Sequence, residues 1–189
     1  MVGPMNDRLT KSDWIGHGLR TLAAHGPSAL KIGAMAAELH VSRGSFYWHF
    51  RDIADFRSRL LESWKDWATQ RVIRELEADH DEPDRLKSLL SRAFSGEPRD
   101  DLSIRSLDKA LRAWAIDDDK VAAVVASVDA DRMAFISKLL EESGVESQKA
   151  AHRAAFLYWA YLGQPIVIKS GLLSSTAAAI DDISDLFRK

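Results

Sequence analysis

The chain has 189 residues, of which 46% are hydrophobic and 29% are charged, and its net charge is −2. This composition is ordinary for a globular protein with a sizeable core. It contains no cysteine, which excludes disulfides and thiolate metal sites. No apolar run approaches the length of a membrane span and the N-terminus shows no signal-peptide pattern, so we expect a cytoplasmic protein without a membrane partner.

Charge is distributed unevenly along the chain. Residues 1–65 carry nine Lys/Arg against six Asp/Glu, whereas residues 66–189 carry seventeen against twenty-two. A mildly basic beginning on an acidic remainder suits a protein that presents one end to phosphate. Because this difference in charge is small, it adds support to a nucleic-acid partner but does not establish one by itself.

The first predicted helix begins after Thr10 or Ser12, either of which can act as its N-cap. Gly26-Pro27 is the expected stop signal at its other end. Gly16-His17-Gly18 follows no strand and lacks a third glycine, so it is read as helix interior and not as a nucleotide loop. The inner face of this helix carries Trp14, Ile15, Gly18, Leu19, Leu22 and Ala23.

Two short helices joined by a tight turn are predicted in the next stretch, KIGAMAAELHVSRGSFYWHF, residues 31–50. His40-Val41-Ser42 interrupts the helical period, and Ser42 is a good N-cap for a second helix that begins at Arg43. These features are the requirements of a helix-turn-helix, whose second helix enters a DNA major groove. The apolar face of the first of these helices consists of Ile32, Met35, Ala36 and Leu39.

The second of these helices carries polar and aromatic side chains that suit a DNA partner. Phe46 and Phe50 are expected in the core, but three successive aromatic rings cannot all face inward on one helix. The alternative is a solvated helical hairpin whose aromatic residues belong to the core. Hydroxyl, guanidinium and ring donors can contact phosphates or base edges, and a glycine lets a backbone come close to its partner. The predicted DNA-binding residues here are Ser42, Arg43, Gly44, Ser45, Tyr47, Trp48 and His49.

The residues from Val41 to Phe50 form the pattern V-S-x-G-x-x-Y-x-H-F, with an amphipathic helix before it and a long helix after it. This arrangement resembles the N-terminal domain of the tetracycline-repressor (TetR) family of transcriptional regulators. The resemblance covers about Lys11 to Leu60. His40 stands where that family usually has a turn glycine, and His tolerates a left-handed backbone better than most residues. Lys31 replaces a common threonine and keeps a phosphate-binding donor. Ile53 replaces a lysine that is common in the family at the start of the following helix and contacts the DNA backbone there. Arg51 is therefore expected to make this contact in its place.

The resemblance implies an all-α protein with two domains. Residues 1–52 would form a three-helix helix-turn-helix DNA-binding domain, and residues 53–189 a helical ligand-binding and dimerisation domain. From the sequence, Asp52 caps a long helix that runs to about Ala78 and links the two mechanically.

Further helices are predicted in the remainder of the chain. They cover Arg85 to Phe94, about Leu102 to Ile116, and a segment after Asp117-Asp118-Asp119 that ends at Ser143-Gly144. The stretch from Asp79 to Asp84 and the Asp117–Asp119 run are acidic, but neither has the spacing of a metal site. We therefore expect linkers and helix caps, and no metal or cofactor.

Residues 154–168, AAFLYWAYLGQPIVI, have almost no polar face. A helix that is apolar all round must be buried all round, and a chain of this size can cover only one side of it. Gly163 and Pro165 predict a kink within this helix. A last amphipathic helix follows Ser174 or Ser175, and two such helices from each subunit would form a four-helix dimer interface, the alternative being a core helix in a monomer. The predicted interface residues are Phe156, Trp159, Leu162, Ile166, Ile180, Ile183 and Phe187, and Leu186 lies on the same apolar stripe.

Aromatic side chains from several body helices are expected to converge on a ligand site, although each could equally be a core residue. Aromatic walls with few charges suit an apolar or aromatic small molecule. The predicted ligand-binding residues are Trp64, Trp67, Phe94, Trp114, Phe135 and Tyr158. The candidate polar contacts are Arg112, Arg132, His152 and Gln164.

Together these features predict a homodimeric, ligand-responsive transcriptional regulator, most simply a repressor. Two recognition helices would occupy successive major grooves of a partly palindromic operator, roughly 34–36 Å apart. The alternative is an architectural or interaction DNA-binding protein without a small-molecule effector. An enzyme is not expected, because the sequence has no G-x-S-x-G, P-loop, metal-binding histidine pair or cysteine nucleophile.

Overall fold

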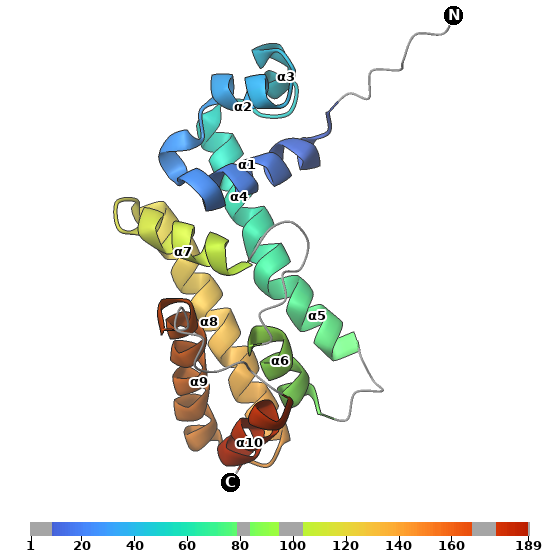
Figure 1. The fold of residues 1–189 in the computed structure, drawn as a ribbon, viewed down its shortest axis with the longest axis vertical. Coiled ribbons are helices and arrows are strands. Elements are labelled where there is room, and N and C mark those ends of the chain that lie inside the picture. The colour runs from blue at the N-terminus through green and yellow to red at the C-terminus, as the bar shows by residue number, and fades with distance from the viewer. Residues whose placement is uncertain (1–8, 79–83, 95–103, 168–176, 189) are drawn as a thin grey trace, which may run out of the picture. The chain divides into compact units, whose positions relative to one another are not determined.

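The computed structural model describes residues 9–78, 84–94, 104–167 and 177–188, without the side chains of residues 104–105, 164–167 and 177–178. Within those ranges every regular element is a helix, which confirms the predicted all-α class (Figure 1). None of the described helices is both long and apolar enough to cross a bilayer. Of the predicted linker and cap at residues 79–84, residues 79–83 lie outside the described residues, whereas Asp84 is described.

The chain forms two compact units. The first consists of Met1–Asp66 with Asp100–Val124, and the second of Trp67–Arg99 with Val125–Lys189. The first unit therefore holds α4 (Ile53–Lys65) and α7 (Ile104–Ala115) together with the N-terminal helices. The division into a DNA-binding domain (residues 1–52) and a ligand-binding and dimerisation domain (residues 53–189) remains a prediction, because compact packing alone does not show what each unit does.

The first unit begins with α1 (Lys11–His25), whose ends follow from local sequence. The Thr10 hydroxyl accepts from the Asp13 N–H, and the Asp13 side chain accepts from the Thr10 N–H, which makes a capping box. At the other end, Gly26 has φ 76°, a value that favours glycine. A short 3-10 turn, Pro27–Ala29, leads into the next helix.

The predicted helix-turn-helix is present as α2 (Ile32–Glu38) and α3 (Arg43–Tyr47). His40 has φ 56°, so it takes the left-handed conformation expected at the turn. The Val41 N–H donates to the carbonyl of Ala36 at 2.9 Å and closes the turn. The turn therefore forms without the usual glycine, and α2 and α3 pack against each other across it.

In the same unit, α1 packs against both α4 and α7. Asp52 caps α4 by accepting from the Asp55 N–H, as predicted. The Arg57 guanidinium lies 5.6 Å from the centroid of the Trp114 ring, which joins α4 to α7.

The second unit consists of a π-helical turn (Asp66–Gln70, of which Asp66 belongs to the first unit), α5 (Arg71–Ala78), α6 (Arg85–Phe94), most of α8 (Asp119–Glu142), α9 (Ser147–Val167) and α10 (Ala177–Arg188). Its core contains Leu76, Leu86, Leu90, Phe135, Leu139, Leu140, Val145, Ala150, Ala154, Leu157 and Ile180. The predicted long helix from Asp52 to Ala78 is thus interrupted once, by the π-helical turn. Helix α9 continues past Gly163 and Pro165 to Val167 without a break.

Candidate nucleic-acid interface

A cluster of aromatic rings fixes α3 to the rest of the first unit. Phe46 and Phe50 are buried, as predicted. The Phe46 ring centroid lies 5.3 Å from that of Trp14, 5.0 Å from Phe50 and 5.5 Å from Phe56. Edge-on and tilted contacts of this kind favour one arrangement over a loose apolar cluster. One face of α3 is therefore committed to the core, and the opposite face is left to solvent.

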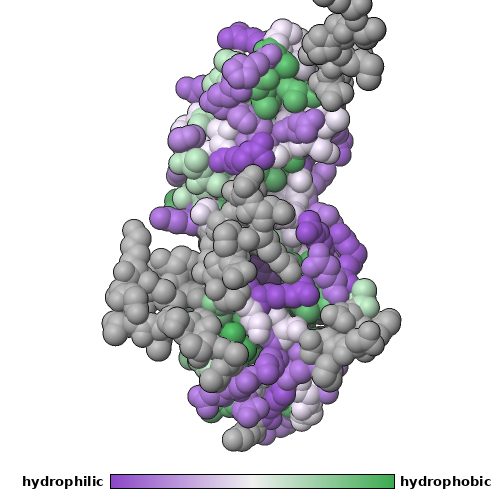
Figure 2. Space-filling view, turned by 45° about the vertical axis from the view of Figure 1, so that its right-hand side comes forward, coloured by the Kyte–Doolittle hydropathy of each residue, from purple (hydrophilic) through white to green (hydrophobic). Residues whose placement is uncertain are grey.

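Tyr47 and Trp48, on the outer side, are among the most exposed aromatic residues described. Their exposed fractions are 58% and 78%. Figure 2 shows hydrophobic and hydrophilic side chains next to each other at the top of the view, where Figure 1 places α2 and α3. Large exposed rings carry a solvation cost that is recovered only when a partner covers them.

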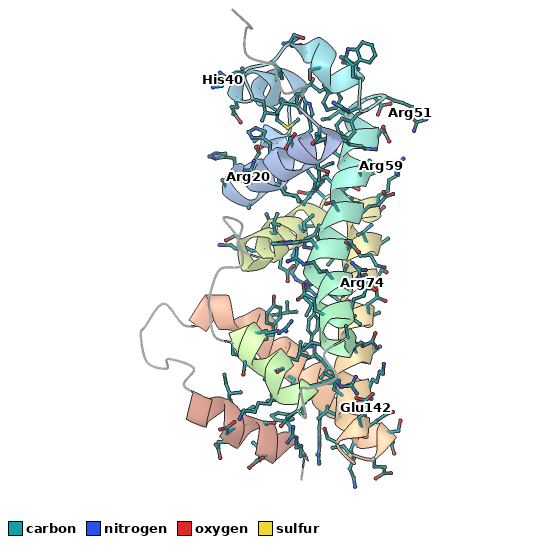
Figure 3. All side chains as sticks on the ribbon, turned by 90° about the vertical axis from the view of Figure 1, so that its right-hand side faces the viewer. Arg20, His40, Arg51, Arg59, Arg74 and Glu142 are labelled. Carbon is teal, nitrogen blue, oxygen red and sulfur yellow. The ribbon has the colours of Figure 1, made fainter. Side chains whose placement is uncertain are left out.

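Most of the other predicted DNA-binding residues are also accessible to solvent. Lys31, Ser42, Arg43, Gly44 and Arg51 are exposed, and Ser45 is half-buried. Figure 3 shows His40 and Arg51 pointing outward on opposite sides of the view. A Cβ added at Gly44 would meet only the Ser42 hydroxyl, at 3.4 Å, so internal packing does not require this glycine.

His49 differs from its neighbours because it is half-buried and already bonded. Its Nε2 lies 2.9 Å from the carbonyl oxygen of Leu9, so that nitrogen donates the hydrogen bond. Nearby, the Lys11 ammonium lies 5.5 Å from the Phe50 ring centroid. His49 therefore connects the end of α3 to the residues before α1, a contact that could not be predicted from the sequence.

Arg43 lies across the helix-turn-helix against α2. A Cβ added at Gly33 would come within 2.7 Å of Arg43 Nη2 and 3.1 Å of Nε. The guanidinium therefore occupies the space that a side chain at position 33 would fill. Sequence spacing could not reveal this contact, because it depends on the direction of a long side chain.

The predicted ligand-binding residues fall into two groups. Trp64 and Trp114 are buried in the first unit, and the other four belong to the second. In the second unit Phe135 lies in the core and Phe94 packs against it. Arg112 is half-buried in the first unit, His152 is exposed on α9, and the side chain of Gln164 lies outside the described residues.

Tyr158 and Arg132, two residues singled out for the ligand site, meet in a polar cluster of the second unit. Arg132 Nη1 donates to the Tyr158 hydroxyl at 3.4 Å, and that hydroxyl donates to Asp129 at 2.6 Å. The Arg132 guanidinium also lies 5.9 Å from the Tyr161 ring, which stacks on Tyr158 at 6.1 Å. Burial raises the pKa of Tyr158 to about 12, so the phenol stays protonated.

The same arginine holds the π-helical turn. Arg132 Nε donates to the Thr69 hydroxyl at 3.0 Å, and Nη2 lies 3.4 Å from the carbonyl oxygen of Ala68. Gln70 in turn donates to Asp131 at 3.0 Å. A π-helical turn disrupts the normal hydrogen-bond ladder, and such turns are frequent at functional sites.

The predicted dimer residues differ in exposure. Phe156 and Trp159 on α9 are 60% and 65% exposed, whereas Ile180 on α10 is buried in the core of its own unit. Leu162 and Phe187 are half-buried and Ile183 is 39% exposed. Leu186, on the apolar stripe of α10, is 67% exposed. The side chain of Ile166 lies outside the described residues.

These features define a class of protein: an all-helical chain that presents a helix-turn-helix on an aromatic support is a helix-turn-helix DNA-binding protein. Residues 16–60 match the family model described as "Bacterial regulatory proteins, tetR family". The N-terminal part of this chain is therefore a helix-turn-helix DNA-binding domain of the TetR family. No curated protein matches the chain.

Solved structures share the fold over nearly the whole chain. The reduced form of Escherichia coli NemR is 18% identical with a TM-score of 0.74, covering 93% of this chain and 96% of its own. A Saccharomonospora viridis protein described as a transcriptional regulator, in complex with choline, is 19% identical with a TM-score of 0.71, covering 94% of each chain. A Rhodococcus protein described as a TetR-family transcriptional regulator is 17% identical with a TM-score of 0.63, covering 95% and 98%.

Proposed function

We propose that this regulator is a homodimeric repressor that binds a partly palindromic operator and is released by a small effector. The exposure of Tyr47 and Trp48 at a helix-turn-helix that also exposes Lys31, Arg43 and Arg51, and whose Phe46 and Phe50 are buried, carries the proposal. Cationic and hydroxyl donors on one face suit phosphates, and exposed rings suit sugars and thymine methyl groups. Two such faces would read two half-sites in one duplex.

The effector is proposed to be an apolar or aromatic molecule without positive charge. The Saccharomonospora viridis protein binds choline, a quaternary ammonium that aromatic ring faces can hold. In this chain the Arg132 guanidinium already lies over the Tyr161 ring, so a second cation there would be repelled. A neutral or anionic molecule could instead accept a hydrogen bond from Arg132.

Release from DNA needs an effector that prefers one conformation of the chain. The chain passes from the first unit to the second between Asp66 and Trp67, at the start of the π-helical turn. Arg132 contacts this turn at Ala68 and Thr69. An effector that competes for Arg132 would change the stability of the turn, and its differential affinity sets the population shift.

The DNA-binding part is tested by Tyr47→Ala, measured by fluorescence anisotropy on a duplex selected by the protein from a random library. We expect affinity to fall on the order of tenfold, because an exposed ring and its hydroxyl would be lost from the interface. Thermal unfolding should change little, since Tyr47 is mostly solvent-exposed. Ile116→Ala is the matched control, because Ile116 is 82% exposed at the end of α7. Equal affinities for all three proteins would contradict the proposed face.

The effector part is tested by thermal shift against neutral, anionic and cationic aromatic compounds. A compound present at about 100 times its dissociation constant should stabilise the folded chain by about 2.7 kcal/mol. The same compound should lower the affinity for the selected duplex, and Arg132→Met should abolish both effects. Stabilisation by no compound would favour a DNA-binding protein without a small-molecule effector.

A further inference from the structure

Gly33 is an unusual residue for its place in the chain. It lies in the first turn of α2, where its backbone is helical and has no positive φ. A glycine inside a helix costs roughly 1 kcal/mol relative to alanine. Backbone geometry therefore does not explain the glycine, and the explanation must come from what lies over it.

The Arg43 guanidinium lies over it. A Cβ at position 33 would be 2.7 Å from Nη2, 3.1 Å from Nε and 3.2 Å from Cζ of Arg43. The Nε–Nη2 edge of the guanidinium therefore lies close to the α2 backbone at Gly33. Any side chain at position 33 would displace it, whereas glycine leaves room for it.

This position puts the charge of Arg43 beside the start of α2 and away from the outer end of α3. Lys31, two residues before Gly33, is exposed at the same end of α2. Within the described residues neither Arg43 nor Lys31 forms an ion pair with a carboxylate, so both charges are available to a ligand. In a helix-turn-helix the first helix crosses the DNA backbone, and the second reads base edges.

We infer that Gly33 is a positioning residue that holds the Arg43 guanidinium on the phosphate-facing side of the helix-turn-helix, where Arg43 and Lys31 together bind backbone phosphates. Arg43 then supplies affinity and register, and the reading of bases is left to other residues of α3. This inference rests on the proposed DNA-binding face, and it assigns one residue of that face a role that the motif leaves open.

The experiment compares wild type, Arg43→Ala, Gly33→Ala and the double variant on the selected duplex and on a scrambled duplex, at several salt concentrations. Arg43→Ala should weaken binding to both duplexes by a similar factor, on the order of tenfold, and should lower the slope of log K against log salt by about one. Gly33→Ala should weaken binding to both duplexes in the same direction. In the Arg43→Ala background, Gly33→Ala should have no further effect, because the displaced group is absent.

Two controls separate positioning from folding and from general charge. Gly16→Ala adds a methyl group to a helix where the nearest atom is Arg20 Nη1 at 3.6 Å, so it should leave DNA affinity unchanged. Arg59→Ala removes one positive charge from α4 of the same unit and should not reproduce the effect of Arg43→Ala. Gly33→Ala should also raise or preserve the unfolding temperature, which excludes misfolding as the cause of weaker binding.

A loss confined to the selected duplex would overturn the inference, because it would make Arg43 a base-reading residue. Additive effects of the two substitutions would also overturn it, since they would separate Gly33 from Arg43. Failure of the wild-type protein to select any duplex would instead remove the proposed function itself.

Discussion

Two glycines of α1, only two residues apart, have opposite surroundings. A Cβ at Gly16 would make an ordinary contact with Arg20 Nη1 at 3.6 Å. A Cβ at Gly18 would come within 2.5 Å of Phe56 Cζ and 2.9 Å of Leu60 Cδ1. Of the two glycines in α1, Gly18 is therefore the one at which α1 closely approaches α4. The aromatic cluster behind α3 includes Phe56, so this approach bears on the support of the DNA-binding face.

Gly18→Ala is expected to destabilise the protein, because the new methyl group must displace a packed ring and a buried leucine. Overpacking of this kind costs roughly 1–3 kcal/mol. Gly16→Ala should instead stabilise by up to about 1 kcal/mol, since alanine is the better helix former. Urea unfolding followed by circular dichroism measures both. Similar midpoints for the two variants would contradict the close crossing of α1 and α4.

Sequence reasoning identified which residues of α3 face the core and which face solvent. The run Tyr47-Trp48-His49 cannot be buried on one helix, and Tyr47 and Trp48 are exposed accordingly. The contacts of His49 with Leu9 and of Arg43 with Gly33 could not be predicted. They depend on side-chain directions and on segments distant in the chain, which periodicity does not encode.

Helix ends were predictable where a local signal marks them. Thr10 caps α1, α6 spans the predicted Arg85–Phe94, and Gly144 ends α8 with φ 92°. The π-helical turn was not predictable, because Trp64, Ala68, Val72 and Leu76 recur every four residues as in an α-helix. Within this turn, Thr69 accepts a hydrogen bond from Arg132, which lies 63 residues further along the chain. A single-sequence pattern carries no information about such a contact.

Asp84 joins two helices of the second unit. Its carboxylate accepts from the Lys87 N–H at 2.9 Å, which caps α6, and also from the guanidinium of Arg188 in the last turn of α10. The hydrogen bond from Arg188 is the largest cause that lowers the pKa of Asp84 below its ordinary 3.8. A carboxyl whose pKa is lower in the folded state stabilises the fold above its unfolded pKa. That stabilisation is lost as the pH falls through the folded-state value.

Arg188→Gln should therefore destabilise the protein at pH 7 by roughly 1 kcal/mol, a modest value because both side chains are partly solvent-screened. The difference from wild type should shrink as the pH falls below the ordinary carboxyl value of 3.8, and should vanish below the lower pKa that Asp84 has in the folded wild type, where Asp84 is protonated in both proteins. Urea unfolding at pH 7 and at pH 3 measures it. Lys149→Gln, which removes an exposed ion pair with Glu146, is the control and should change little at either pH. A loss that is independent of pH would mean that Arg188 acts through packing alone.

One chain leaves a set of large apolar side chains uncovered on the last two helices. Phe156, Trp159 and Leu186 are 60%, 65% and 67% exposed, although residues 154–168 contain almost no polar side chain. The Phe156 ring centroid lies 5.9 Å from that of Phe187, which itself packs against the core, so part of this surface is anchored and preformed. Contiguous exposed apolar residues on a stable support are typical of a protein–protein interface. Binding of two half-sites in one duplex requires a second copy of the helix-turn-helix, and a second chain docked on this surface would supply it.

Trp159→Lys is accordingly expected to weaken self-association, because it removes a large aromatic side chain and would bury an unpaired charge. Loss of one central aromatic residue raises the dissociation constant on the order of thirtyfold or more. Sedimentation equilibrium over a range of concentrations measures this change, and Ile116→Lys is the control, since Ile116 is even more exposed than Trp159 but lies outside α9 and α10. The Trp159 variant should also bind a two-half-site duplex no more tightly than a single half-site, whereas wild type should prefer the longer duplex. If Trp159→Lys remained a dimer as stable as wild type, the apolar surface of α9 and α10 would need another occupant, and paired binding of DNA would have to arise elsewhere in the chain.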